Sequence, residues 1–346
     1  MAQSQVSVEL PGVAGVPRSL SDRPVFYRAG VHIWRFVTGK PLGALGAVLI
    51  VLVLIAATFT DQLDRYDPNL TFQKSNPAYD PELAQQALLD PNVRLQHPPE
   101  VFEEGGVLNR LGKPSSENWL GTDHLGRDLW SRIIHGSQTA VVVGFGASTI
   151  AVALGVIIGL ASAYFGGWVD FGIQRMVDTF QAFPALVLLL LFNQVVADPT
   201  LYWITLSLGI LGIAQVVRIV RSAVLSAREE VYVTAAKTVG ASDVRIMARH
   251  IFPNVTAPII VVFTSTIGVY ILAEATLGFL GLSDPTRPSW GKMVEEGRRQ
   301  GTGEPLMALF VGGALTLTVL GFNLAGDALR DVLDPRMRGR GSRAGF

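Results

Sequence analysis

Cysteine is absent from the 346 residues, which excludes a disulfide framework, a thiolate metal site and a cysteine nucleophile. Charge is scarce: Asp, Glu, Lys and Arg make up 16% of the chain, against about 25% in a typical soluble domain. Basic and acidic residues both number 28, so net charge gives no sign of a nucleic-acid partner, and we expect none. With 49% hydrophobic residues and a mean hydropathy of +0.38, the composition predicts a membrane protein.

Motifs for nucleotide and metal chemistry are missing as well. The pairs Gly39-Lys40 and Gly112-Lys113 are each followed by proline and lack a glycine five residues earlier, so neither forms a phosphate-binding loop. The five histidines are scattered and no His-Glu-x-x-His motif occurs, so we expect no metal site. The apolar segments lack the polar set that a membrane-embedded enzyme needs. We therefore predict that the chain is not an enzyme and holds no cofactor of its own.

Long apolar runs are what the chain has in quantity. Six of them are near the roughly 20 residues that a membrane-spanning helix needs. They cover residues 42–58, 139–165, 181–197, 201–220, 257–282 and 305–324. A cleaved signal peptide ending near Ala56-Ala57 is the alternative for the first run, but its 40-residue lead is too long. We predict an all-α membrane protein with six transmembrane helices, in which 166–180 is a short connector.

The runs divide the chain into five predicted parts. These are a cytoplasmic tail 1–40, a first transmembrane helix 41–60, an extracytoplasmic insert with an interfacial helix 61–138, a five-helix core 139–325 and a cytoplasmic tail 326–346. Basic residues gather in both tails, and an even number of spans puts both termini on the same, cytoplasmic side. The insert is expected to contain a helix over 81–90 and to meet the membrane through Trp119 and Trp130.

One polar segment inside the core, 229–254, has the pattern of two short helices separated at Gly240. Gly240 suits the left-handed residue that ends a helix, Ser242 suits the N-cap of the next, and Pro253 is expected to stop or kink that second helix. The apolar positions that we expect against the headgroups are Val231, Ala235, Val239, Val244, Met247 and Ile251. The pattern predicts an amphipathic helix pair at the membrane surface with one face free to meet another protein.

Three motifs resemble those of ABC importer permeases of the dipeptide, oligopeptide and nickel branch. The segment 229–254 resembles their coupling loop through Thr234-Ala235-Ala236, Gly240 and Ile251-Phe252-Pro253, with Thr234 at the position of the usual Glu. The insert carries Gly121-Thr122-Asp123 and Gly126-Arg127-Asp128, which resemble the segment before the second spanning helix of that branch. The resemblance implies a type I permease fold with six spans.

The resemblance also implies partners and a mechanism. Such a permease lies in the cell inner membrane with a second, commonly different permease, two ATPase subunits that hold ATP and magnesium, and an extracytoplasmic solute-binding protein. Closure of the ATPases drives alternating access through the coupling loop. The coupling residues implied here are Thr234, Ala235, Ala236, Gly240, Ala241, Ile251 and Pro253.

Three polar residues in the apolar runs are candidates for the transport pathway. Glu274 is costly in a span and indicates either a pathway residue or a structural contact near the span end, and we favour the latter. Asn193 and Gln215 are expected to form inter-helix hydrogen bonds. The sequence does not specify the solute, although the resemblance implies peptides or related small solutes. A passive channel, a permease for nickel or another solute, and an exporter remain alternatives.

Overall fold

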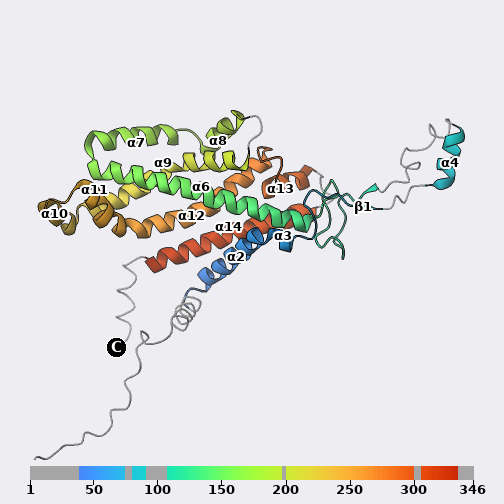
Figure 1. Cartoon of the computed structure of the whole chain (residues 1–346), viewed down its shortest axis with the longest axis horizontal. Coiled ribbons are helices and arrows are strands. Elements are labelled where there is room, and N and C mark those ends of the chain that lie inside the picture. The colour runs from blue at the N-terminus through green and yellow to red at the C-terminus, as the bar shows by residue number, and fades with distance from the viewer. Residues whose placement is uncertain (1–38, 75–79, 91–106, 197–199, 300–304, 334–346) are drawn as a thin grey trace, which may run out of the picture.

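The computed structural model describes residues 39–74, 80–90, 107–196, 200–299 and 305–333. Most of the predicted tails 1–40 and 326–346 lies outside these ranges. Long helices run side by side, with α10 and α11 at one end and α3, β1 and α13 toward the other (Figure 1). We call these the hairpin end and the insert end.

The architecture is helical, as predicted. The helices are α2 (Pro41–Thr58), α3 (Thr60–Leu63), α4 (Pro81–Leu89), α6 (Leu129–Phe165), α7 (Gly167–Gln181), α8 (Ala185–Gln194), α9 (Leu201–Arg228), α10 (Val231–Thr238), α11 (Asp243–Ile246), α12 (Phe252–Phe279), α13 (Trp290–Arg299) and α14 (Pro305–Leu333), with a π-helix at Met247–Ile251. Two short antiparallel strands, β1 (Gln73–Lys74) and β2 (Val107–Leu108), pair within the insert.

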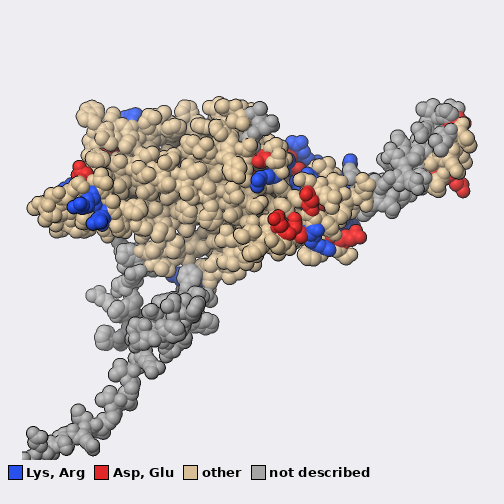
Figure 2. Space-filling model, viewed as in Figure 1, with Lys and Arg blue, Asp and Glu red and all other residues tan. Residues whose placement is uncertain are grey.

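Five helices of the described residues are long and apolar enough to cross a membrane, or up to six if the bent pair α7 and α8 counts as one span. Figure 2 shows charged side chains gathered toward the two ends of the bundle, with a broad band of other residues between them. That distribution fits a bundle whose middle lies in hydrocarbon.

The prediction of a third span as one straight helix over 181–197 is wrong. Residues 166–180 are not a connector but mostly the helix α7, and α8 has only ten residues, or about 15 Å, which is too short to cross. The two helices meet at 83°. Pro184 lacks an N–H group and disfavours helical backbone at Phe183, so the apolar run 181–197 is broken near its start.

A ring of polar contacts holds α7 against α6 and α9. Gly166 adopts a left-handed φ of 64°, which lets the chain reverse after α6. The carboxylate of Asp170 then accepts hydrogen bonds from Ser162 of α6 at 2.6 Å and from both Nε and Nη2 of Arg221 of α9 at 2.7 and 2.6 Å. A bidentate arginine pair of this kind fixes orientation as well as distance.

The centre of the bundle is the contact between α6 and α9. Small residues at every fourth position of α6 share one buried stripe, which comprises Ala147, Ala151, Gly155, Gly159 and Ala163. A Cβ atom on Gly155 would lie 2.6 Å from the side chain of Val216, and one on Gly159 would lie 2.9 Å from the carbonyl oxygen of Val217. The stripe therefore serves close helix packing.

Most other helices run past the ends predicted from hydropathy. The first span and the helix at 81–90 are confirmed as α2 and α4. The expected interfacial helix is not separate, because α6 is continuous from Leu129, with Trp130 donating to the carbonyl oxygen of Leu63 at 3.0 Å. α9 continues to Arg228 and α14 to Leu333. These extensions contain charged residues, which a helix tolerates once it leaves the hydrocarbon.

Buried ion pairs hold the insert end together. Asp123, which is fully buried, pairs with Arg127 at 2.7 Å and with Arg132 of α6. Arg132 also lies 3.2 Å from Glu296 of α13, so residues far apart in the sequence share one cluster. Gly121 and Gly126 have left-handed φ values of 84° and 77°, which explains the glycines of the two insert motifs.

Candidate functional site

The hairpin 229–254 stands on a buried apolar base. Val233, Ala236, Ile246 and Ile251 are buried in the same core cluster as Val224 and other residues of the bundle. Complete burial of a valine or isoleucine side chain contributes about 2 kcal/mol. The hairpin is therefore a packed extension of the bundle and not a loose loop.

The turn at Gly240 forms as predicted. Gly240 has φ of 78°, its N–H donates to the carbonyl of Lys237 at 3.0 Å, and the N–H of Ala241 donates to that of Ala236 at 3.1 Å. This pair of bonds is the Schellman arrangement that ends a helix at a left-handed glycine. Ser242 occupies the N-cap position of α11 as expected, but its side chain makes no capping hydrogen bond.

Pro253 does not stop the second helix. Residues 243–279 form one continuous helical segment, and Pro253 lies in the first turn of α12. A π-helix at Met247–Ile251 precedes it, with the N–H of Phe252 donating to the carbonyl of Met247. The wider turn accommodates the proline, whose missing N–H would break a regular helical ladder.

The structure shows which apolar side chains of the hairpin pack against the bundle. Of the six apolar positions expected to face the headgroups, only Ile251 is buried, and Met247 is half-buried. Val231, Val239 and Val244 are 81%, 83% and 71% exposed. Val233 and Ala236, which lie between these positions on α10, pack against the bundle, so the exposed valines are available to the headgroups or to a partner.

The predicted coupling residues divide between the two faces. Thr234, Ala235, Gly240 and Pro253 are exposed, Ala241 is half-buried, and Ala236 and Ile251 are buried within this chain. A Cβ atom on Gly240 would meet nothing within 4 Å. Lys237, Arg245 and Arg249 are also exposed, and Figure 2 shows a basic patch at the hairpin end. The exposed surface of the hairpin therefore combines apolar side chains with positively charged ones.

Contacts to α6 that the sequence did not predict fix the position of the hairpin. The hydroxyl of Tyr164 donates to Asp243 at 2.6 Å, and the Nζ atom of Lys237 lies 5.5 Å from the centre of the Tyr164 ring. Arg228 donates to the carbonyl of Ala163 at 2.8 Å. A tyrosine in the last turn of an apolar run was the available signal, since its ring can pack while its hydroxyl meets a polar partner.

The three polar residues within the spans have different surroundings. Glu274 is buried, with its carboxyl group next to the hydroxyl of Ser289. Asn193 is buried and lies 3.5 Å from the Ser207 hydroxyl of α9, which agrees with the expected contact between helices. Gln215 is exposed, contrary to the expectation of an inter-helix hydrogen bond.

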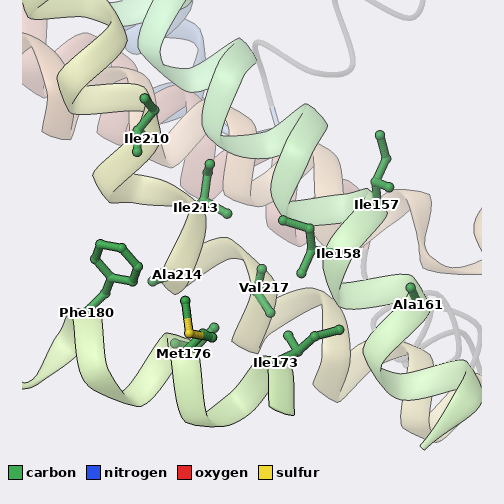
Figure 3. A pocket seen from close by; sticks show the side chains of 11 residues that line it. Ile157, Ile158, Ala161, Ile173, Met176, Phe180, Ile210, Ile213, Ala214 and Val217 are labelled. Atoms are coloured by element: carbon green, nitrogen blue, oxygen red, sulfur yellow. The ribbon is translucent and has the colours of Figure 1, made fainter. Parts of the chain in front are cut away.

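Two neighbouring pockets lie beside α7 and α9 and share Phe180 and Ala214. One has a volume of about 550 Å³ and only apolar lining side chains, contributed by α6, α7 and α9 (Figure 3). The other has a volume of about 420 Å³, opens at the bend between α7 and α8, and includes Gln181 and Gln215. The polar groups are thus confined to one side of this face.

A cation site at the insert end is chemically disfavoured. Potential ligand atoms of Asp123, His124 and Glu296 lie within 4.8 Å of one another. However, Arg127 and Arg132 already pair with both carboxylates. Burial would raise the pKa of Asp123, but the charges of Arg132 and Arg127 and backbone hydrogen bonds outweigh it, so the pKa is lowered. Two guanidinium groups repel a metal ion.

Comparison with known proteins identifies the family. The dipeptide transport system permease protein DppC of Alkalihalophilus pseudofirmus is 42% identical over 238 residues, which cover 68% of this chain and 78% of that protein. A putative peptide transport system permease protein of Brucella suis biovar 1 is 34% identical over 98% of both chains. The glutathione transport system permease protein GsiD of Escherichia coli O6:K15:H31 is 33% identical, covering 89% of this chain and 91% of its own.

These relatives are all named as permeases of transport systems, so they favour the importer permease over the passive channel. The family model for the binding-protein-dependent transport system inner membrane component matches residues 151–339. This stretch begins within α6 and includes α7, α8, α9, the hairpin, α12, α13 and α14. The chain belongs to the family of binding-protein-dependent transport system inner membrane components, the permeases of ABC importers.

Proposed function

We propose that this chain is one permease subunit of an ATP-driven importer for short peptides, and that the hairpin 229–254 couples it to an ATPase. The peptide class is supported by the names of the relatives, which are dipeptide, peptide and glutathione transport permeases. The chain itself supplies no phosphate-binding loop, so ATP and magnesium belong to the ATPase subunits. The hairpin end faces the cytoplasm in this arrangement, as do both termini.

The observation that carries the coupling role is the exposed apolar surface of the hairpin. Val231, Val239 and Val244 project from a base that is itself fully packed. Each would contribute about 2 kcal/mol if a partner buried it completely. Exposed apolar side chains next to basic residues are typical of a protein interface. A rigid base then transmits the partner's movement to α6 through Tyr164 and Asp243.

The remaining partners complete the pathway. A second permease, which we expect to be a different chain, would close the transport path against this one. An extracytoplasmic solute-binding protein would deliver the peptide at the insert end, where residues 61–138 offer a docking surface. Closure of two ATPases would then switch the pair of permeases between inward and outward access.

Co-purification tests the proposal directly. The Val239→Asp variant changes a side chain that is 83% exposed, so the fold should be retained while the interface gains a desolvated charge. We expect the wild type to retain two ATPases and a second permease in detergent, and Val239→Asp to lose the ATPases. Leu89→Asp is the matched control, because Leu89 is 87% exposed on α4 at the other end.

A second variant addresses the turn. Gly240→Trp puts a large side chain on the exposed tip and strains the left-handed backbone, so it should also prevent ATPase binding. Retention of the ATPases and of peptide uptake by both variants would show that the hairpin has no coupling role. A wild-type chain that purifies alone would refute the importer assembly itself.

A further inference from the structure

The pocket at the bend between α7 and α8 lies on a face where lipid is an unsuitable neighbour. Gln181 and Gln215 are exposed there, and Arg218 pairs with Asp178 at 2.5 Å while both side chains stay about half exposed, at 49% and 48%. Polar and charged groups in spanning helices face protein or water-filled space because burial in hydrocarbon is costly. The face therefore meets water or another chain.

The depth of these groups supports that conclusion. Tyr202 and Trp203 begin α9 at the insert end, the position of an interfacial aromatic pair. Gln215 follows Leu201 by fourteen residues, or about 21 Å of helix, and Arg218 lies about 26 Å along. Both distances fall within the roughly 30 Å of hydrocarbon in a bilayer.

The polar groups form two facing rows. Asp178 and Gln181 are three residues apart on α7, and Gln215 and Arg218 are three residues apart on α9, so each pair shares one helix face. The two amides line the pocket of about 420 Å³ together with Phe180, Phe183, Leu188 and Leu211. Asp178 and Arg218 do not line it and lie about one helical turn away from the amides, on α7 and α9. This volume and the mainly apolar wall with few polar groups are typical of a small-molecule site.

The chemistry of the two rows matches a short peptide. A glutamine amide both donates and accepts, as a peptide group does, so Gln181 and Gln215 can bond to a peptide backbone. Asp178 and Arg218 supply the charges opposite to a peptide's terminal ammonium and carboxylate groups. Because these two side chains are half exposed and paired only with each other in the described structure, a zwitterion can exchange with their ion pair.

We propose that this pocket, which we call the elbow pocket, binds the peptide in transit. Gln181 and Gln215 hold its backbone inside the pocket, while its amino and carboxyl termini reach Asp178 and Arg218 about one helical turn beyond the amides. The assignment rests on the proposed function and adds a site to it. The adjoining apolar pocket lacks polar groups and suits an apolar side chain or lipid instead (Figure 3).

The absence of cysteine makes a direct test possible. Ala185 is exposed and lines the elbow pocket, so Ala185→Cys introduces a unique thiol in this chain with little change of volume. Val51→Cys on α2 is the control, because Val51 is 52% exposed in the middle of an apolar helix. The assembled complex, checked by its co-purifying ATPases, is reconstituted in liposomes and treated with a water-soluble maleimide with and without dialanine.

We expect labelling of Ala185→Cys and none of Val51→Cys. Dialanine at ten times its Kd should slow the labelling about tenfold. N-acetyl-dialanine and dialanine amide each lack one terminal charge and should require about tenfold higher concentrations. Adding Gln215→Leu to the Ala185→Cys chain should remove the protection without removing the labelling.

Three results would contradict the proposal, wholly or in part, while leaving the importer assembly intact. An unlabelled Ala185→Cys thiol in the assembled complex would mean that the partner permease or lipid covers the elbow pocket. Labelling that dialanine does not slow would mean that the pocket is water-filled but binds no peptide. Equal protection by dialanine and its two blocked derivatives would refute the roles of Asp178 and Arg218.

Discussion

The two ends of the bundle differ in what their side chains contact: buried ion pairs within the chain at the insert end, and solvent-exposed apolar side chains at the hairpin end. At the insert end, Asp123 and Arg132 are buried and pair with each other, and Arg132 also pairs with the partly buried Glu296 of the same chain. At the hairpin end, the polar contact between Tyr164 and Asp243 holds the base while valines remain exposed. The first arrangement fixes the fold, whereas the second leaves an apolar surface for a partner.

This difference separates residues that stabilise the fold of the chain from residues that are available to bind a partner. A buried ion pair contributes stability only when every charged group has its partner, so its loss should lower the free energy of unfolding. An exposed valine contributes little until another protein covers it, so its loss should affect assembly and not the fold. Substitutions at the two ends should therefore change different measured quantities.

The largest expected effect on stability is at the insert end. Asp123→Asn removes the charge that faces Arg127 and Arg132, and we expect it to lower the free energy of unfolding by about 3 kcal/mol. Chemical denaturation of the purified chain in detergent measures this change. Glu117→Gln is the control, since Glu117 is exposed in the same segment and a surface change costs less than about 0.5 kcal/mol. If both substitutions lower the free energy of unfolding equally, the buried ion pairs of Asp123 do not stabilise the insert end.

A smaller effect is expected where the hairpin meets α6. Tyr164→Phe removes the hydroxyl that donates to Asp243, at a cost of about 1 kcal/mol. The ATPases should still bind, but each ATP hydrolysed should import less peptide because the hairpin is held less firmly. The ratio of uptake to ATP hydrolysis in liposomes measures this loss. Tyr202→Phe serves as control, since Tyr202 is 74% exposed at the opposite end of α9. An unchanged ratio would remove Tyr164 from the coupling route.

The smallest effect is the pH dependence of the stability that Asp123 contributes at the insert end. The pKa of Asp123 is lowered in the folded chain, because the neighbouring arginines outweigh the effect of burial. A lowered pKa adds stability above the unfolded value of about 3.9 and loses it as the pH falls through the folded value. The difference in melting temperature between wild type and Asp123→Asn should therefore shrink below about pH 4. If the difference in melting temperature grows on acidification, the pKa of Asp123 is raised in the folded chain and not lowered.

Local sequence signals predicted the elements whose conformation depends on adjacent residues. The helix α4 begins at Pro81 after Asp80, whose side chain accepts from the N–H groups of Glu82 and Leu83. Gly240 ends α10 because the left-handed region favours glycine. In the same way, the apolar run 42–58 predicted α2 nearly to the residue.

Local patterns were insufficient where they allow two arrangements. On α10, Val233 and Ala236 pack against the bundle while Val231 and Val239 stay exposed, a division that the apolar pattern alone does not specify. The apolar run 181–197 was likewise predicted as one helix, although the helix is interrupted at Pro184 between α7 and α8. Gln215 was expected between helices, but the placement of α7 leaves it at the elbow pocket.

The sequence by itself determined a helical membrane protein without a phosphate-binding loop and, through the resemblance of its motifs to those of ABC importer permeases, its family. Hydropathy, composition and short motifs are properties of neighbouring residues. Only the tertiary structure decided which face of the hairpin is exposed, how α7 and α8 bend, and that Asp123 meets Glu296. These outcomes depend on contacts between segments far apart in the chain, where burial and charge pairing select one of several arrangements that local preference allows equally.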